Sequence, residues 1–401
     1  MNTLMSFSTP YYLFDKKGFM DNFNNLIGSM RKYYPRYRPA YSYKTNYTPY
    51  ICGLAKDIGA YAEVVSDMEL TLAYKLGYAP QNIIYNGPSK GEMMDAFLFQ
   101  GGIVNIDNKV EAKRVIELAK RNLEKDIKVG LRINTDIGAG FTSRFGMDIE
   151  GGEIQEVVSE INSQRNLRLV GLHMHVSRAR NIEAWQRRID NMLYAADKYI
   201  QDVPEYLDLG SGMFADMEDF LRNQFVIKIP DYEEYARVVA GTMARHYEGS
   251  EILPILITEP GTTVVARYLS LITKVIGIKQ IKDYRMAMVD SDYHQLGETG
   301  HMMKCPYSIF RTGNPSEAIQ PPLNVVGFTC LEQDILFKDF PESLSIGDRI
   351  EFRNIGGYSI VYKPPFIQPQ CPIYVNEEGE MKVIKRAETF NDIFHTFSFN
   401  E

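Results

Sequence analysis

A lysine at the end of an apolar run is the first residue of this sequence that could do chemistry. Lys44 follows the run Ala40 to Tyr43 and precedes Thr45 and Asn46. A lysine that a strand delivers into a partly dry pocket loses solvation, so the pKa of its ammonium falls and the amine can condense with an aldehyde. The alternative is a solvated lysine after a strand. This alternative is disfavoured because five further segments fit the same site.

A carboxylate and a small-residue turn follow two later strands. Glu259 precedes a Pro-Gly pair, which stops a helix and permits close backbone approach, so its carboxylate can pair with a protonated ring nitrogen. The run Gly210, Ser211 and Gly212 lets backbone N–H groups come close to a phosphate. A tight turn is the alternative for this run.

Two histidines and two later loops complete the set. His173 and His175 are two residues apart, so a strand would place both on one side. A metal pair is one interpretation, but no third ligand is obvious nearby, which favours stacking of one imidazole on a planar cofactor. Cys330 and Tyr358 follow later strands, and their alternatives are a small buried thiol and a packed ring.

Alternating strands and helices must position these groups. Eight short apolar strands are predicted at 40–43, 61–65, 82–85, 103–106, 128–133, 169–175, 206–209 and 255–259. Helical segments between them include 67–76, 109–121, 182–199 and 231–245. Eight strand–helix repeats are the count of a (β/α)8 barrel, which gathers reactive groups at the C-terminal ends of its strands.

Beyond residue 271 the pattern changes to β-rich segments with turn signals. These are predicted at 270–278, 285–290, 324–329, 349–352 and 359–362, and they indicate a second, β-type domain. The apolar strand Tyr11–Phe14 precedes the barrel pattern and is expected to join that domain. The predicted organisation is therefore a barrel over 33–272 and a β-domain made of 1–32 and 273–401.

Composition indicates an ordinary globular protein. The chain has 401 residues, is 45% hydrophobic and carries a net charge of −7, which argues against a nucleic-acid or anionic-membrane partner. Its four cysteines are few and scattered, as in a reducing compartment. We find no signal-peptide pattern and no apolar run of membrane-spanning length, so the sequence predicts a cytoplasmic protein.

Taken in order, these motifs resemble those of the fold-type III pyridoxal-phosphate decarboxylases. This family contains diaminopimelate, ornithine and carboxynorspermidine decarboxylases, and its relatives include alanine racemase. The resemblance runs from the first strand to about Phe366. It implies an alanine racemase-like fold, with a cofactor-binding TIM-like barrel and a C-terminal β-sandwich or β-barrel domain. It also implies pyridoxal 5′-phosphate as the cofactor and a homodimer with shared active sites.

The resemblance also implies roles for individual residues. Lys44 would be the Schiff-base lysine, Glu259 would pair with the pyridine nitrogen, and His175 would stack on the ring. Cys330 would reprotonate the carbanion, reaching the site from the other subunit. The remaining cofactor contacts would be Ser177, Gly210, Ser211, Gly212, Gly261, Thr262 and Tyr358.

Three departures from the family pattern bear on the substrate. Thr262 stands where many members carry an arginine, and Ser177-Arg178 replaces the usual Gly-Ser, so Arg178 is expected to restore the lost positive charge. Leu331 follows the cysteine where ornithine and diaminopimelate enzymes carry an acid for the distal end of the substrate. A buried ammonium facing Leu331 would be unpaired at a cost of roughly 1–3 kcal/mol, which disfavours plain ornithine, lysine or diaminopimelate bound in the standard way.

The substrate expected from these motifs is a carboxynorspermidine-like or conjugated diamino acid. The segment 330–334 is more similar to carboxynorspermidine decarboxylase, whereas the ending at 356–366 resembles diaminopimelate-type enzymes that act on conjugated amino acids. Each candidate substrate contact has an exposed loop residue as its alternative. The candidates are Arg144, Arg178, His301, Lys304, Glu332 and Asp334.

Two other functions remain open from the sequence. A racemase would use the same lysine and cofactor with a base on the opposite face. A non-catalytic relative would bind a decarboxylase subunit as a regulator, but it would be expected to lose the lysine or the cofactor contacts, which this chain retains. No metal is expected in any of these cases.

Overall fold

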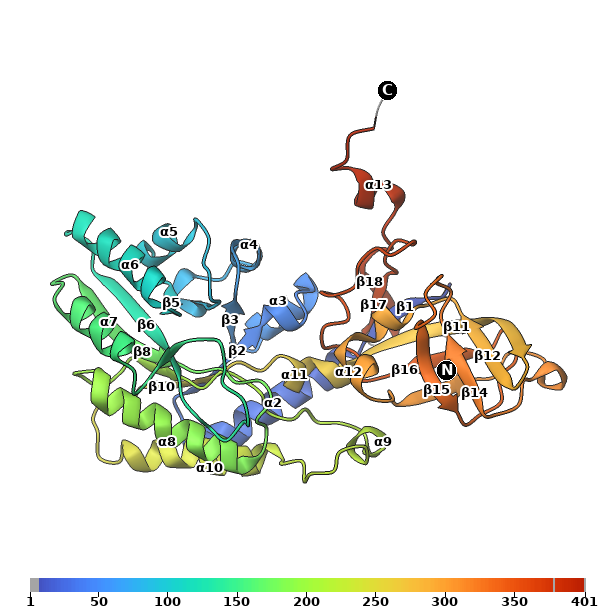
Figure 1. Cartoon of the computed structure of the whole chain (residues 1–401), viewed down its shortest axis with the longest axis horizontal. Coiled ribbons are helices and arrows are strands. Elements are labelled where there is room, and N and C mark those ends of the chain that lie inside the picture. Colours follow the sequence, from blue (N-terminus) through green and yellow to red (C-terminus); the bar gives the residue numbers. More distant parts are fainter. Residues whose placement is uncertain (1–6, 378, 400–401) are drawn as a thin grey trace. The chain divides into compact units, whose positions relative to one another are not determined.

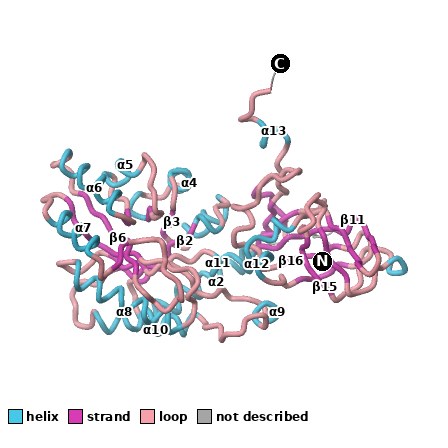
Figure 2. The backbone as a smooth tube through the Cα atoms, viewed as in Figure 1, coloured by secondary structure: helices cyan, strands magenta, loops and turns pink. Residues whose placement is uncertain are grey.

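The chain forms two compact units. The structure is a computed structural model that describes residues 7–377 and 379–399. Residues 21–214 and 228–263 form the barrel unit, and the described parts of 1–20, 215–227 and 264–401 form the sheet unit. Figure 1 follows the chain in colour along both units, and Figure 2 distinguishes their helices from their strands.

The barrel unit is built on eight parallel strands that close on themselves. Their order is β2, β3, β4, β5, β6, β8, β9 and β10, and β10 pairs again with β2. The bounds are β2 (Tyr37–Ser42), β3 (Tyr61–Val64), β4 (Ile83–Tyr85), β5 (Ile103–Ile106), β6 (Ile127–Asn134), β8 (Leu167–His173), β9 (Tyr206–Asp208) and β10 (Ile255–Thr258). A two-residue strand, β7 (Met147–Asp148), lies beside the end of β6.

Helices surround these strands in Figure 2. The longer ones are α2 (Lys16–Tyr33), α3 (Pro49–Asp57), α4 (Asp67–Lys75), α5 (Met94–Phe99), α6 (Lys109–Arg121), α7 (Gly152–Asn162), α8 (Ile182–Tyr199) and α10 (Tyr232–His246). Their starts follow from local sequence, because Asn108 and Asn181 accept hydrogen bonds from first-turn N–H groups of α6 and α8. Asp231 and Glu234 form a capping box at the start of α10.

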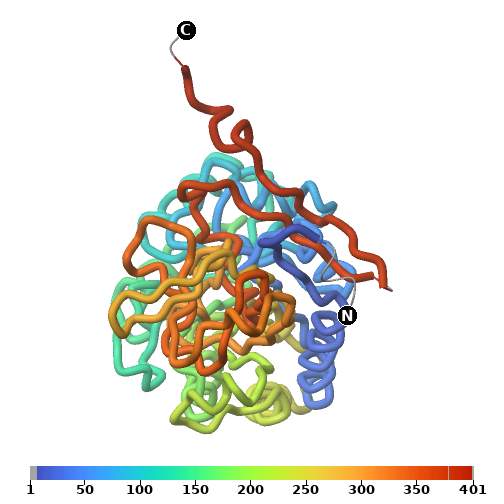
Figure 3. The backbone as a smooth tube through the Cα atoms, turned by 90° about the vertical axis from the view of Figure 1, so that its right-hand side faces the viewer, coloured from blue at the N-terminus to red at the C-terminus, as the bar shows by residue number. Residues whose placement is uncertain are grey.

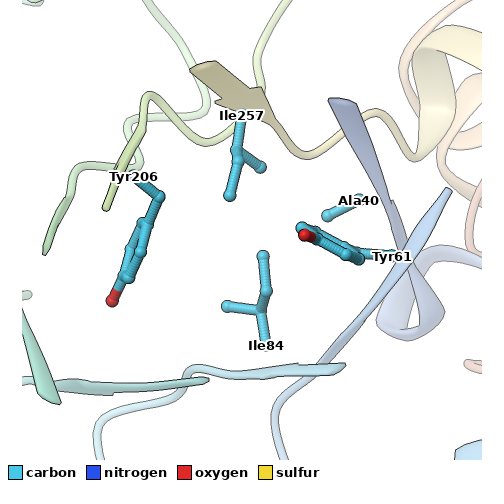
Figure 4. Packing of buried hydrophobic residues seen from close by; sticks show 5 residues of the cluster. All are labelled: Ala40, Tyr61, Ile84, Tyr206 and Ile257. Carbon is cyan, nitrogen blue, oxygen red and sulfur yellow. The ribbon is translucent and has the colours of Figure 1, made fainter. Parts of the chain in front are cut away.

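Apolar and aromatic side chains fill the barrel toward the N-terminal ends of its strands. Ala40, Tyr61, Ile84, Tyr206 and Ile257 come from five different strands and point toward one another (Figure 4). A cavity of about 320 Å³ lies at the same N-terminal ends of the strands, with Tyr61 and Tyr206 in its lining. Barrels of this kind place their reactive side chains at the C-terminal ends of the strands, opposite this packed end.

The sheet unit is a nine-stranded mixed sheet. Its main path runs β15, β14, β12, β11, β1, β17 and β18, while β16 joins β11 to β13. The bounds are β1 (Tyr11–Phe14), β11 (Leu269–Ile281), β12 (Tyr284–Val289), β13 (Tyr307–Phe310), β14 (Leu323–Val326), β15 (Ile335–Phe340), β16 (Arg349–Phe352), β17 (Ile373–Glu377) and β18 (Glu380–Lys385). Short helices α9 (Asp219–Arg222), α11 (Thr262–Val265), α12 (Gly297–Met302) and α13 (Phe390–Phe394) complete the secondary structure.

The N-terminal strand lies inside this sheet. β1 pairs antiparallel with β11 and parallel with β17, so residues from the two ends of the chain are neighbours. Figure 3 shows the blue N-terminal chain beside the red C-terminal chain. In the described parts of the chain, the structure contains no helix with the length and apolarity needed to cross a bilayer.

The predicted fold class, a (β/α)8 barrel with a β-domain, is confirmed, and three predicted elements need correction. The first barrel strand begins at Tyr37 and ends at Ser42, and Lys44 lies in the following 3-10 turn η1 (Tyr43–Thr45). The strand predicted over 169–175 ends at His173. The strand predicted over 359–362 is a turn, because Tyr358 has φ +63° and the chain cannot stay extended there.

Candidate active site

The amine of Lys44 lies beside a second carboxylate. Its Nζ donates to Ser42 Oγ at 2.8 Å and also forms an ion pair with Glu63 on β3. Glu63 is buried, whereas the Lys44 side chain is 28% exposed, so the amine is anchored from inside the barrel and remains reachable from outside. Ser42 also donates to Glu63, which makes this a three-member hydrogen-bonded group.

A buried carboxylate follows β10 in the same unit. Glu259 is fully buried, and its two oxygens lie 3.1 Å from His173 Nε2 and 3.1 Å from His175 Nδ1. Asn86 donates a further hydrogen bond to it. Burial acts to raise the pKa of Glu259, but the two histidines and the positive charge of Lys44 outweigh it and hold the pKa well below its usual range. Glu259 therefore keeps its negative charge.

Asp208 at the end of β9 has the opposite character. It is fully buried, and burial together with the charge of Glu259 raises its pKa well above the usual range. Its Oδ1 accepts a hydrogen bond from Gly210 N at 2.9 Å, while Oδ2 has no partner among the described residues. The pKa values of the two neighbouring buried acids are therefore shifted in opposite directions, which favours the charged form of Glu259 and the protonated form of Asp208.

A chain of amides fixes which way the hydrogen bonds run. Tyr206 donates to Asn105 at 2.6 Å, and Asn105 donates to Asn86 at 2.8 Å. The amide group of Asn86 is therefore turned toward Glu259, and it also lies 3.3 Å from Glu63. The two carboxylates of the site share this one donor.

The two histidines reach Glu259 from different backbone positions. His173 is the last residue of β8, and His175 lies beyond the strand, so the expectation that both occupy one face of a strand is wrong. Burial lowers the pKa of both imidazoles, and that of His175 falls to about 4. Donor atoms of His173, Asp208 and Glu259 lie within 4.8 Å of one another, a spacing that suits a divalent cation as well as a hydrogen-bonded cluster.

One nitrogen of His175 has two competing partners. Nδ1 lies 3.1 Å from Glu259 Oε2 and 3.2 Å from the backbone nitrogen of Ser211. A protonated Nδ1 donates to Glu259 and cannot accept the Ser211 N–H. Because Glu259 keeps its charge, the Nδ1–H form is favoured, which releases the Ser211 N–H to another acceptor.

Close backbone approach explains the glycines at 210 and 212. Gly210 has φ +61° and Gly212 has φ +109°, and a Cβ on either would lie within 2.5 Å or 2.8 Å of a carbonyl oxygen of the chain after β8. Only glycine fits both restrictions. The run from 210 to 212 therefore packs backbone to backbone against residues 174–177.

Gly261 brings the Glu259 loop against the Lys44 turn. A Cβ at this position would lie 2.1 Å from Thr45 Oγ1, and the preceding Pro260 accepts a hydrogen bond from Ser42 N at 3.2 Å. The ends of β10 and β2 are thus held together, which places the Glu259 carboxylate and the Lys44 amine in one site. The electrostatic effect of Lys44 on Glu259 has the same origin.

Other predicted contacts of the barrel unit lie at its surface. The side chains of Arg144, Ser177 and Arg178 are exposed. Arg144 lies between β6 and β7 with its guanidinium 4.1 Å from the centroid of the Phe145 ring. Thr262 is half-buried at the start of α11.

The cysteine loop of the sheet unit is held by an acid. Cys330 is exposed in the loop after β14. Asp334 is buried and accepts hydrogen bonds from the backbone nitrogens of Thr329 at 3.0 Å and Tyr293 at 2.9 Å, as well as from the Thr329 hydroxyl. Glu332 is exposed in the same loop. We refer to residues 327–334 as the cysteine loop.

Three more predicted residues also lie in the sheet unit. His301 is exposed, with Nε2 3.1 Å from the carbonyl oxygen of Tyr293. Lys304 is exposed, and its Nζ lies 5.2 Å from the centroid of the Phe337 ring. The ring of Tyr358 stacks on that of Tyr362 with centroids 5.0 Å apart.

Sequence reasoning missed several polar residues of the site. Glu63 and Asp208 were included in apolar strands, although an acid inside such a run was the available signal. Nothing in the sequence marks Asn86 and Asn105, because their roles arise from the pairing of neighbouring strands. Arg188 on α8 was also missed, because an arginine on an amphipathic helix is ordinarily solvated.

The chemistry of the residues in the barrel unit fits pyridoxal phosphate. The amine of Lys44, which can condense with a carbonyl, lies in one site with the buried carboxylate of Glu259, whose lowered pKa keeps it ionised, and the tight turn at 210–212 offers N–H groups to an anion. A barrel that carries these groups at the C-terminal ends of its strands has the features of the barrel enzymes that use pyridoxal phosphate.

Comparison with known proteins gives the family. Residues 20–266 match the family described as pyridoxal-dependent decarboxylase, pyridoxal binding domain, and residues 193–356 match the pyridoxal-dependent decarboxylase C-terminal sheet domain. The chain belongs to the pyridoxal-dependent decarboxylases. It is a pyridoxal-phosphate-dependent amino-acid decarboxylase, and the racemase and regulator alternatives are set aside.

Relatives differ in the substrates that their names give. Diaminopimelate decarboxylase of Aquifex aeolicus is 25% identical over 408 residues, covering 97% of this chain and 91% of that protein. L-glutamyl-[BtrI acyl-carrier protein] decarboxylase of Niallia circulans is 25% identical over 420 residues, covering 97% and 94%. The crystal structure of diaminopimelate decarboxylase from M. jannaschii has the same fold, with a TM-score of 0.85 at 22% identity over 100% of this chain and 94% of that one.

Proposed function

We propose that this decarboxylase acts on a carboxynorspermidine-like or conjugated diamino acid, and not on ornithine or diaminopimelate bound in the standard way. The cysteine loop is the observation that carries the proposal. Leu331 directly follows Cys330, and Asp334 uses its carboxylate to hold the loop. Within this loop only the exposed Glu332 has a carboxylate left for a distal ammonium.

The relative from Niallia circulans supports a conjugated substrate. Its name describes a glutamyl group carried by an acyl-carrier protein, so a chain 25% identical to this one acts on a conjugated amino acid. An acylated distal nitrogen carries no charge and needs no acid, which suits Leu331. A free ammonium at that place would lose its hydration without gaining a partner.

The roles that we propose for the residues are those that the family resemblance implies. Pyridoxal phosphate, when bound, supplies a protonated ring that accepts the electron pair left by departing carbon dioxide. Lys44 would hold the cofactor through its amine, and the negative charge of Glu259 would keep the ring nitrogen protonated. His175 would pack on the ring, and Cys330 or a water would supply a proton to the substrate carbon that loses its carboxylate. We assign the phosphate to Ser177, the run 210–212, Gly261, Thr262 and Tyr358.

Substrate preference is tested by incubating the holoenzyme with three groups of amino acids. The groups are free diamino acids, carboxynorspermidine-type triamines and diamino acids acylated on the distal nitrogen. We expect amine product and carbon dioxide, detected by mass spectrometry, from a long or conjugated substrate, with kcat/KM at least about tenfold above ornithine and diaminopimelate because the distal ammonium is unpaired. Turnover of free diaminopimelate at the higher rate would refute the proposal and point to Glu332 as its acid.

Sharing of active sites in a homodimer is part of the proposal. If Cys330 reaches the site of the other subunit, Lys44→Ala and Cys330→Ala chains are each impaired, but a mixed dimer contains one site with both native residues. Mixing the two variants under conditions that exchange subunits should restore about one quarter of the wild-type kcat, as expected for random pairing. Activity that stays at the level of the separate variants would show that each site is formed within one chain.

A further inference from the structure

A buried arginine holds two loops of the candidate active site. Arg188 on α8 has no exposed surface. Its Nη1 donates to the carbonyl oxygens of Leu209 at 3.0 Å and Ser211 at 2.7 Å, and its Nη2 donates to that of Val176 at 2.7 Å. One guanidinium therefore joins the loop after β9 to the loop after β8.

The charge of Arg188 has no carboxylate partner in an ion pair within the described residues. Its Nε has no hydrogen-bond partner there either, and the guanidinium lies 4.1 Å from the centroid of the Trp185 ring. Burial lowers the pKa of Arg188 to about 9, so it remains largely protonated at neutral pH. A buried cation without an anion is costly, and a dianionic phosphate bound nearby would lower that cost.

The carbonyl contacts determine where the neighbouring N–H groups point. In a trans peptide the carbonyl and the following N–H point in opposite directions. Since the carbonyls of Ser211 and Val176 point toward Arg188, the N–H groups of Gly212 and Ser177 point away from it. Neither N–H donates to a partner in the described parts of the chain.

These two N–H groups belong to adjacent loops. A Cβ on Gly212 would lie 2.8 Å from the carbonyl oxygen of Val176 and 3.4 Å from that of Ser177. Two unused backbone donors on neighbouring loops, both directed away from the same guanidinium, are available to bind an anion. The release of the Ser211 N–H from His175 would add a third donor from the same run.

We propose that Arg188 is a positioning residue that shapes the phosphate cradle by holding three carbonyls on its own side of the two loops. The inference rests on the proposed function, in which these loops take the phosphate of the cofactor. Arg188 also supplies a buried positive charge beside these loops. Thr262 stands where many members of the family carry an arginine, and Arg178 is exposed. Arg188 acts through the backbone of other residues and need not touch the cofactor.

The test compares the affinity of the cofactor-free protein for pyridoxal 5′-phosphate and for pyridoxal. Both aldehydes can condense with Lys44, and only the first has a phosphate, so the ratio of the two dissociation constants measures the cradle. We expect the wild type to bind pyridoxal phosphate at least about 100-fold more tightly. In Arg188→Gln the ratio should fall at least about tenfold, with pyridoxal binding within about threefold of wild type.

Two further variants separate positioning from stability and charge. Ile189→Ala removes a buried side chain from the same helix that makes none of the three hydrogen bonds to the loop carbonyls, so it should lower the melting temperature and leave the ratio unchanged. Arg188→Lys keeps the charge but cannot span three carbonyls, so its ratio should fall at least about fivefold. This variant also carries the test if Arg188→Gln does not fold.

Each outcome bears on the inference. An unchanged ratio in Arg188→Gln, or a wild-type ratio in Arg188→Lys, overturns the positioning role and leaves the proposed function intact. The same fall in Ile189→Ala would show that loss of stability alone reproduces the effect, and it also overturns the role. A wild type that binds both aldehydes equally refutes the assignment of the phosphate to these loops, and the inference with it.

Discussion

Replacing Lys44 with alanine should abolish the visible absorbance of the lysine-bound cofactor and lower decarboxylation by roughly 10⁴-fold or more, because the amine that condenses with the cofactor's carbonyl is removed. Absorbance spectra after reconstitution with pyridoxal phosphate and single-turnover product analysis measure both effects. A visible band that survives in the purified variant would show that another lysine binds the cofactor.

The matched variant Lys44→Arg separates the amine from its charge. Arginine can still pair with Glu63 but is not a nucleophile at neutral pH, so its activity should fall as far as that of the alanine variant. Stability should differ, because Lys44→Ala leaves the buried Glu63 without its positively charged partner, at a cost of up to about 3 kcal/mol. Equal melting temperatures for the two cofactor-free variants would contradict the structural importance of this ion pair.

Replacing Glu259 with glutamine should lower kcat by roughly 10²- to 10³-fold while binding of the cofactor changes less. Glutamine has the same shape, but it has no negative charge to keep the ring nitrogen protonated as electrons arrive. Steady-state kinetics on the preferred substrate, with cofactor affinity measured separately, test this expectation. Activity within tenfold of wild type would refute the role of Glu259.

Asp208 provides the control for this replacement. Because its raised pKa favours the protonated form, asparagine at this position changes the charge less than glutamine does at Glu259. Asp208→Asn should therefore retain activity to within about tenfold, even though Asp208 is as deeply buried as Glu259. Comparable losses in both variants would show that disruption of the buried cluster, and not the charge of Glu259, lowers the rate.

The sequence predicted most of the barrel because strand and helix patterns are local. The eight strands, the start of α8 and the end of α6 follow from runs of apolar residues and helix caps. The end of β8 did not follow, because Met174 and Val176 continue the apolar pattern beyond the strand. The supposed strand at 359–362 contains β-favouring residues, but the turn at Tyr358 determines its course.

The candidate site was only partly predictable for a different reason. Lys44 and Glu259 were found because each follows an apolar strand and precedes turn residues. Glu63, Asp208 and Arg188 act through contacts between elements far apart in the sequence, and their residue types alone suggest solvent exposure. Only the fold shows that each is buried and what it contacts.

Tyr206 belongs to two systems at once. Its ring belongs to the same packed cluster as Ala40 and Ile257, toward the N-terminal ends of the strands (Figure 4). Its hydroxyl begins the chain of hydrogen bonds that ends at Glu259. A substitution among the residues packed around this ring would therefore shift the phenol and disturb the hydrogen bond that orients Asn105. Packing at the N-terminal ends of the strands and the orientation of the amide that faces Glu259 are thus coupled through a single side chain.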